Sequence, residues 1–247
     1  MAGLTGGATT VLNIAGADNL TLTAVTADRI DATNFTGVLN VATNANVDSI
    51  QGGSGNDVFD VDADAAVTIN GGAGNDTITV AAGTLTNRTL VIDGGAGTAD
   101  NLNITTASAV GDRYTISGIE LVTVDADSTF DARDFTGKTF VLTGDTGGAA
   151  ETITFDMASS TAIDLGNITV NADEVAVVIN NTTNLATTVV ATNDADDITT
   201  AGGADSITAG AGNDTIDSGA GNDTIIGGEG ADSITAGAGN DTINLTE

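Results

Sequence analysis

The last part of the chain repeats one nine-residue unit six times without insertion. From Ala191 the units read ATNDADDIT, TAGGADSIT, AGAGNDTID, SGAGNDTII, GGEGADSIT and AGAGNDTIN. The sixth position of every unit is aspartate, and the eighth is isoleucine. A short fixed period indicates a repeat architecture, in which each unit stacks on its neighbours and a continuous core is buried.

The residue types in the unit predict a turn that binds calcium. Glycines at the second and fourth positions allow a positive φ and let backbone carbonyl oxygens approach one another. Calcium takes six to eight oxygens at about 2.3–2.6 Å, from carboxylates and carbonyls alike, and the aspartate supplies the carboxylate. The residues after the aspartate alternate polar and apolar, so they predict a short strand with its isoleucine pointing inward.

Two units make one coil of 18 residues, so aspartates 18 apart are expected to form two columns, one on each edge of the stack. Like charges in a column would repel, which makes the metal part of the fold. The predicted carboxylate ligands of the array are Asp196, Asp205, Asp214, Asp223, Asp232 and Asp241. The predicted turn glycines are Gly203, Gly210, Gly212, Gly219, Gly221, Gly228, Gly230, Gly237 and Gly239.

Further copies of the unit occur upstream. GGSGNDVFD begins at Gly52 and GGAGNDTIT at Gly71, close to one coil apart, so Asp57 and Asp76 are expected to share a calcium ion. The predicted glycines here are Gly53, Gly55, Gly72 and Gly74. Two degenerate copies, GGAGTADNL with Asp100 and TGGAAETIT with Glu151, are each open to two interpretations, a metal site or a plain turn.

The rest of the chain predicts short strands. Runs such as TTVLNIAG, RTLVIDGG and ETITFD alternate polar and apolar residues between Gly, Asn or Asp, and no helical period persists. Their spacing suits a solenoid or a sandwich, and the embedded repeats favour the solenoid. We therefore predict an all-β, right-handed parallel β-solenoid or calcium β-roll. Residues 1–190 are expected to form a solenoid with calcium turns at 52–60, 71–79 and 94–102, and residues 191–244 a C-terminal roll.

One longer motif occurs twice, as IDATNFTG at residues 30–37 and as FDARDFTG at residues 130–137. Phe35, Phe130 and Phe135 are three of only six phenylalanines. The favoured interpretation is two equivalent plugs of the hydrophobic core, and the alternative is a binding role for these aromatic rings.

Composition excludes several functions. Five basic residues against 34 acidic ones argue against a nucleic-acid partner. The chain has no histidine and no cysteine, which removes HExxH zinc sites and the common Ser/His and Cys/His catalytic pairs, so we do not expect an enzyme. No apolar run approaches 18 residues, so no membrane span is expected.

The unit matches the G-G-x-G-x-D-x-U-x repeat of RTX proteins, and the middle of the chain resembles RTX-type calcium-binding surface-layer proteins of alphaproteobacteria. The resemblance is carried by the strand SGIELVTV (residues 117–124), by FDARDFTG and by the repeat blocks. It implies a parallel β-solenoid, type I secretion, and calcium-dependent crystallisation on the cell surface. The chain is shorter than these proteins and lacks their helix-rich module that binds lipopolysaccharide.

The expected function is that of an extracellular, calcium-dependent, self-assembling structural protein, either a surface-layer or a filament subunit. The alternative is a calcium-rigidified binding segment of an RTX adhesin. The expected partner is a second copy, joined head to tail through the last coil of the array and the strand near residues 11–14, in a stretch (residues 4–17) without charge. A cell-surface polysaccharide is the candidate anchor. Calcium is the only expected cofactor, and it is millimolar outside the cell.

Overall fold

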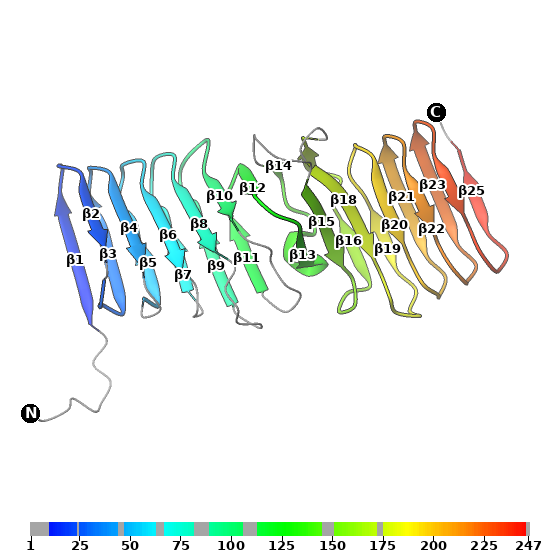
Figure 1. The fold of residues 1–247 in the computed structure, drawn as a ribbon, viewed down its shortest axis with the longest axis horizontal. Helices are drawn as coiled ribbons and strands as arrows, with labels where there is room; N and C mark the ends of the chain where they lie inside the picture. The colour runs from blue at the N-terminus through cyan, green and yellow to red at the C-terminus, as the bar shows by residue number, and fades with distance from the viewer. Residues whose placement is uncertain are drawn as a thin grey trace, which may run out of the picture.

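The chain winds into one long parallel β-solenoid (Figure 1). The computed structural model describes residues 10–23, 25–43, 47–62, 67–81, 89–105, 113–144, 151–171 and 175–245. The strands of these residues lie in four sheets, and the paired strands are parallel. The predicted all-β parallel solenoid is therefore confirmed. No helix among the described residues has the length and apolar character needed to cross a membrane.

Two sheets form the N-terminal half, and each coil adds one strand to each of them. Sheet 1 contains, in order, β1 (Val11–Gly16), β3 (Arg29–Phe35), β5 (Ser49–Gln51), β7 (Val67–Asn70), β9 (Thr89–Asp93) and β11 (Arg113–Ser117). Sheet 2 contains β2 (Leu20–Thr23), β4 (Leu39–Thr43), β6 (Val58–Asp62), β8 (Thr77–Ala81), β10 (Asn101–Ile104), β12 (Leu121–Val124), β14 (Phe140–Gly144) and β17 (Ile168–Val170).

Two other sheets form the C-terminal half. Sheet 3 contains β13 (Ser128–Asp131), β15 (Glu151–Asp156), β18 (Val175–Asn180), β20 (Asp196–Thr199), β22 (Thr215–Asp217) and β24 (Ser233–Thr235). Sheet 4 contains β16 (Ala162–Asp164), β19 (Thr188–Val190), β21 (Ser206–Ala211), β23 (Thr224–Glu229) and β25 (Thr242–Asn244). Both sheets continue across residue 190. The predicted boundary between two domains at this residue stays a prediction.

The core follows from the period-two alternation along each strand. On β8 the apolar Ile78 and Val80 are buried and lie in register with Phe59 and Val61 of β6. In the array the isoleucine at the eighth position of each unit points inward, and the first four of the six, Ile198, Ile207, Ile216 and Ile225, are buried. Stacked apolar rows of this kind fill the narrow space between two sheets.

The two halves are joined where the solenoid exchanges one pair of sheets for another. Sheet 1 ends at β11, sheet 3 begins at β13, and sheet 2 continues to β17. Between β13 and β17 the coil therefore has three sides, with a strand in sheet 3, a strand in sheet 2, and a third side that begins with a short helix, α1 (Ala132–Phe135).

Helix α1 connects the last strand of sheet 1 to the first strand of sheet 4 through hydrogen bonds. The backbone N–H of Tyr114 on β11 donates to Oδ2 of Asp134 (2.8 Å). On the other side, the N–H of Gly137 donates to the carbonyl of Asp164 (2.7 Å), and the Asp164 N–H donates to Oγ1 of Thr136 (2.7 Å). The helix thus takes the position that a strand occupies elsewhere on this side of the solenoid.

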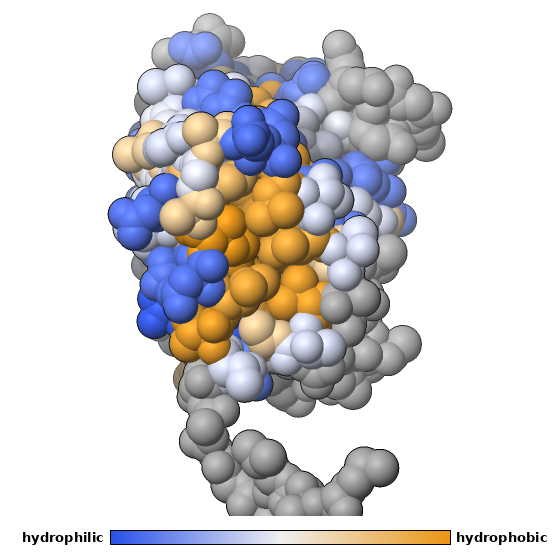
Figure 2. Space-filling view, turned by 90° about the vertical axis from the view of Figure 1, so that its left-hand side faces the viewer, coloured by the Kyte–Doolittle hydropathy of each residue, from blue (hydrophilic) through white to orange (hydrophobic). Residues whose placement is uncertain are grey.

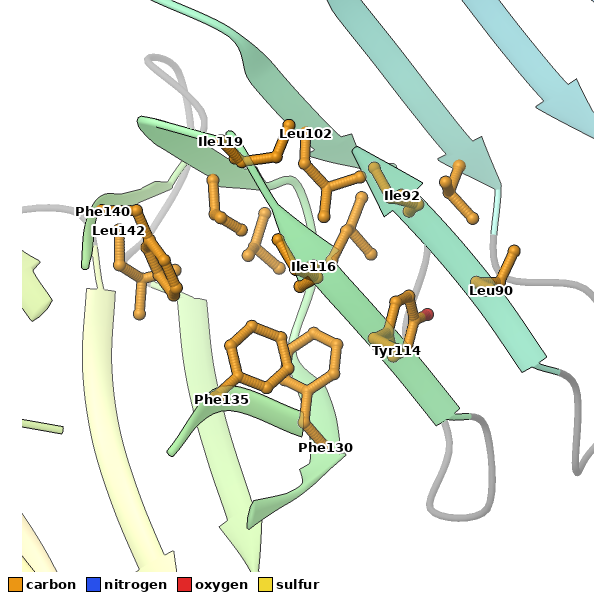
Figure 3. Packing of buried hydrophobic residues seen from close by; sticks show 14 of the residues in the cluster. Leu90, Ile92, Leu102, Tyr114, Ile116, Ile119, Phe130, Phe135, Phe140 and Leu142 are labelled. Atoms are coloured by element: carbon orange, nitrogen blue, oxygen red, sulfur yellow. The ribbon is translucent and has the colours of Figure 1, made fainter. Parts of the chain in front are cut away.

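A three-sided coil encloses more space than a two-sided one, and aromatic rings fill it (Figure 3). The ring centroids of Phe130 and Phe135 are 4.8 Å apart, and those of Phe135 and Phe155 are 5.5 Å apart. Tyr114 and Phe130 pack edge to face at 5.7 Å. Both phenylalanines of FDARDFTG are buried, which confirms their predicted core role.

The prediction that the two copies of the motif are equivalent is wrong. In both copies the aspartate accepts a hydrogen bond from the N–H two residues later: Thr33 donates to Asp31 (3.2 Å) and Arg133 donates to Asp131 (3.0 Å). In the first copy this bond accompanies a register shift within a continuous strand, and Phe35 is buried in the two-sided core. In the second copy the same bond caps the N-terminus of α1, because a third side must begin there.

Phe135→Ala should lower the free energy of unfolding by about 3–5 kcal/mol, since the ring lies at the centre of the aromatic cluster and its loss leaves a cavity. Val141→Ala on β14 is the matched control, because Val141 faces outward and is 41% exposed. Chemical denaturation in saturating calcium measures both variants. Equal losses would contradict the assignment of the cluster as the main apolar core of the junction.

Candidate calcium centre

The calcium-turn sequences lie on the edges of the solenoid, where the chain passes from one sheet to another. In the N-terminal half, Asp57, Asp76 and Asp100 lie on the edge between sheets 1 and 2, immediately before β6, β8 and β10. We call this set the N-terminal column. In the array the turns alternate between two edges. The first array column holds Asp196, Asp214 and Asp232, and the second holds Asp205, Asp223 and Asp241.

Hydrogen bonds link the aspartates of the N-terminal column directly. The N–H of Asp57 donates to Oδ1 of Asp76 (2.7 Å), and the N–H of Asp76 donates to Oδ1 of Asp100 (2.7 Å). Oδ1 of Asp57 accepts from the N–H of Leu39 in the preceding coil (2.8 Å). Each carboxylate therefore lies one coil away from the next, although the spacing in sequence grows from 19 to 24 residues.

The array columns use the same bond. In the first, the Asp196 N–H donates to Asp214 (2.9 Å), and the Asp214 N–H donates to Asp232 (3.1 Å). In the second, Asp205 donates to Asp223 (2.9 Å) and Asp223 to Asp241 (3.1 Å). The aspartates 18 apart in sequence stack as the sequence predicts.

Most of these aspartates leave one carboxylate oxygen buried and without a hydrogen-bond partner. These oxygens are Oδ2 of Asp76, Asp100, Asp205, Asp214 and Asp223, and Oδ1 of Asp196. A buried carboxylate oxygen without a partner is costly, and a calcium ion would satisfy it. Asp57 differs, because its Oδ2 accepts from the Gly53 N–H (2.9 Å).

The first glycine of each N-terminal unit marks the space where an ion would fit. A Cβ on Gly52 would overlap the carbonyl oxygen of Gly71 and lie 2.9 Å from Oδ2 of Asp57. A Cβ on Gly71 would overlap both the carbonyl oxygen of Gly94 and Oδ2 of Asp76. At each step a carboxylate of one turn and a carbonyl of the next face the same small space, which only glycine leaves open.

The predicted site residues did not include Gly52, Gly71 and Gly94, because the prediction assigned a role only to glycines at the second and fourth positions of the unit. The Gly-Gly doublet that opens each N-terminal unit was the available signal. The described residues contain no group of three or more acidic side chains placed to hold a metal. Backbone carbonyls are therefore expected to be ligands beside the carboxylates, as the glycine positions indicate.

All the predicted glycines allow a close backbone approach, but they differ in backbone conformation. Those of the array, together with Gly72 and Gly74, have a positive φ. The prediction of a positive φ is wrong for Gly53 and Gly55, which are not in this region. They are needed for close approach, since a Cβ on Gly53 would overlap the carbonyl of Phe35 and one on Gly55 that of Gly37.

The degenerate copy at Glu151 is only partly described. Glu151 opens β15, its side chain is buried, and its Oε2 has no hydrogen-bond partner. The residues 146–150 that would form the turn lie outside the described residues. The choice between a metal site and a plain turn therefore stays open for this copy.

Burial raises the pKa of the stacked carboxyl groups in the metal-free protein. It raises the pKa of Asp76 and of Asp196 to about 7, and neighbouring carboxylates add to the effect, while hydrogen bonds from N–H and hydroxyl groups oppose it. Burial is also the main cause of the raised pKa of Asp57, Asp100 and Asp214. A bound divalent cation would act in the opposite direction, because it favours the ionised form.

Comparison with known proteins agrees with this geometry. A family model, the RTX calcium-binding nonapeptide repeat, matches four segments of the chain, residues 42–67, 63–84, 190–225 and 218–246. These repeats are calcium-binding, and the matched segments hold two aspartates of the N-terminal column and all six of the array. Residues 94–100 lie outside the matched segments. No curated protein and no solved structure matches the chain.

Asp214→Ala should reduce calcium affinity in the array at least about tenfold, which corresponds to about 1.4 kcal/mol. Asp196→Ala should have a smaller effect, because Asp214 has a turn of the array on both sides, whereas Asp196 begins its column. Isothermal titration with calcium measures both. The control is Asp217→Ala, since Asp217 is exposed on β22, and equal losses from Asp214→Ala and Asp196→Ala would contradict the bridging role.

The metal-free fold should lose stability as the pH rises from about 4 to about 7. The raised pKa values of Asp76 and Asp196 mean that the folded chain binds more protons than the unfolded chain in this range, so the free energy of unfolding falls with pH. Calcium competes with these protons, so the stabilisation by calcium should be greatest above pH 7. Thermal unfolding at pH 5, 6, 7 and 8, in calcium-free and in calcium-containing buffer, tests both trends. A calcium-free stability that rises with pH would contradict them.

Proposed function

We propose that this chain, which carries RTX calcium-binding nonapeptide repeats, is a subunit of a calcium-dependent structural assembly outside the cell, a surface layer or a filament. RTX repeat proteins are generally secreted, and they are typically structural. The proposal further rests on one feature of the solenoid, namely that both of its end coils leave apolar residues and strand edges uncovered in the described part of the chain.

The N-terminal end presents an apolar face (Figure 2). Leu12 of β1, together with Leu20 and Leu22 of β2, packs on the core but is only partly buried. Val11 on the same edge is 45% exposed. The backbone groups of β1 and β2 on this side pair with no other strand among the described residues.

The last described coil likewise leaves apolar side chains exposed. Ile243 of β25 is 46% exposed and Leu245 is 69% exposed, whereas Ile225, the register partner of Ile243 on β23, is buried. Beside them a cavity of about 490 Å³ is lined by Gly228, Gly230, Asp232 and Leu245. This cavity lies beside Asp232, the last aspartate of the first array column.

The uncovered strands at the two ends can pair with each other in parallel. A second copy that places its β1 beside β24 and its β2 beside β25 would continue both parallel sheets and cover Leu12, Leu20 and Ile243. An uncovered strand edge is a template for pairing, and a contact between different surfaces gives an open chain rather than a closed dimer. This supports head-to-tail growth. The surface-layer resemblance supports a lattice, with a cell-surface polysaccharide as candidate anchor.

Light scattering with and without calcium separates this function from its alternative. The protein should form polymers when calcium is added, and these should dissociate in chelator. A folded, calcium-bound monomer over the same concentration range would contradict self-assembly and favour a calcium-rigidified binding segment of an adhesin.

Ile243→Lys should give a soluble, calcium-bound monomer, because a charge at the centre of the proposed contact would be buried without a partner. The matched control is Thr242→Lys. Thr242 belongs to the same strand, but side chains alternate along a strand, and its register partner on β23, Thr224, is exposed, so polymers should still form. Polymerisation of Ile243→Lys at the wild-type concentration would overturn the assignment of this end as the interface.

A further inference from the structure

We propose a third calcium site in the N-terminal column, held between the turn of residues 94–100 and the short turn of residues 118–120. The second of these turns, Gly118-Ile119-Glu120, contains no nonapeptide unit, and the repeat family model matches neither turn. The proposed ligands are the Asp100 carboxylate and the Gly118 carbonyl, with the Glu120 carboxylate as the second acidic group.

The space between these turns has the same construction as the two preceding steps of the column. A Cβ on Gly94 would overlap the carbonyl oxygen of Gly118 and lie 2.8 Å from Oδ2 of Asp100. The two oxygens therefore lie within about 5 Å of each other, a separation that one calcium can span with ligand distances of about 2.3–2.6 Å. Gly52 and Gly71 border the equivalent spaces one and two coils earlier.

The Asp100 carboxylate also needs a partner. The residue is fully buried, its Oδ1 accepts the Asp76 N–H (2.7 Å), and its Oδ2 has no hydrogen-bond partner. The buried, unpartnered oxygen is the one that faces the Gly118 carbonyl. Because leaving it without a partner is costly, a cation at this point would satisfy both oxygens.

Glu120 occupies the position of the column aspartate in the next coil. Its Oε2 accepts the N–H of Asp100 (2.8 Å), just as Oδ1 of Asp76 accepts the N–H of Asp57 (2.7 Å). The N–H groups of Glu120 and Leu121 both donate to the Asp100 carbonyl (3.1 Å each), which fixes the short turn against the longer one. The extra methylene of glutamate allows its carboxylate to reach the column from a turn of only three residues.

The column ends beyond Glu120. The backbone of the next coil is linked to it through the Val141 N–H, which donates to the Glu120 carbonyl (2.9 Å). In register with Asp100 and Glu120 the next coil carries Phe140, which has no carboxylate. Two residues earlier in the same turn, Nζ of Lys138 donates to the carbonyl of Ile116 (2.8 Å). Without a carboxylate at this position, and with an ammonium group in the same turn, a further divalent cation is disfavoured, so the proposed site is the last of the N-terminal column.

Counting bound calcium by native mass spectrometry tests the site. Gly94→Ala fills the space without changing the charge and should bind one calcium fewer than the wild type. Gly166→Ala is the control, because Gly166 borders no carboxylate of a column, and its φ is not in the left-handed region. An unchanged number of ions in a folded Gly94→Ala would overturn the proposal.

Glu120→Gln provides a second test that keeps the shape of the side chain, and it decides the matter if Gly94→Ala does not fold. Calcium titration should show one site weakened about tenfold or more, with the other sites unchanged. The control is Glu229→Gln, the same change in an exposed residue of a calcium turn. If the affinities of Glu120→Gln equal those of the wild type, the assignment is wrong. The readout is calcium binding to single subunits, so it is independent of whether the protein assembles.

Discussion

The stacking of buried carboxylates at the spacing of β-strands is the constraint on which the rest of the structure depends. Parallel pairing places equivalent turns about 4.8 Å apart, and two unit charges at that distance repel by roughly 3–4 kcal/mol at an effective dielectric constant of 20. In every column the backbone N–H of one aspartate binds the carboxylate of the next, which orients the side chains but does not neutralise them. A bound cation would offset this repulsion, because it favours the ionised carboxylates.

The junction depends on a different interaction. Around β13 and α1 the coil is wider, and four phenylalanines and one tyrosine pack together there. On either side the coil is narrower, and each strand buries about one to three apolar side chains, most of them aliphatic. The junction is thus stabilised by apolar burial, whereas the coils that carry the aspartate columns bury acidic groups that need a metal.

Much of this organisation could be predicted from the sequence, because the nine-residue period is a direct consequence of the stacking. The period predicts the parallel solenoid, the inward isoleucines such as Ile216, and the aspartate columns. The local sequence pattern could not predict that sheet 3 replaces sheet 1 at β13. The motifs FDARDFTG and IDATNFTG share most of their residues, yet they differ in structure. Glu120 was also missed as a member of the column, because it lies outside any repeat and only the pairing of β10 with β12 brings it beside Asp100.

The eight-stranded sheet 2 has a consequence for how the molecule recovers from a loss of calcium. It starts at the N-terminal coil and passes through the aromatic junction before it ends at β17. A solenoid can propagate its structure from any coil that stays formed. If the coils on either side unfold while β12 and β14 stay paired at the junction, both halves can refold from this pair of strands. A strand that returns one residue out of register would turn its apolar side chains to water, so the middle of the chain preserves the alignment of the whole.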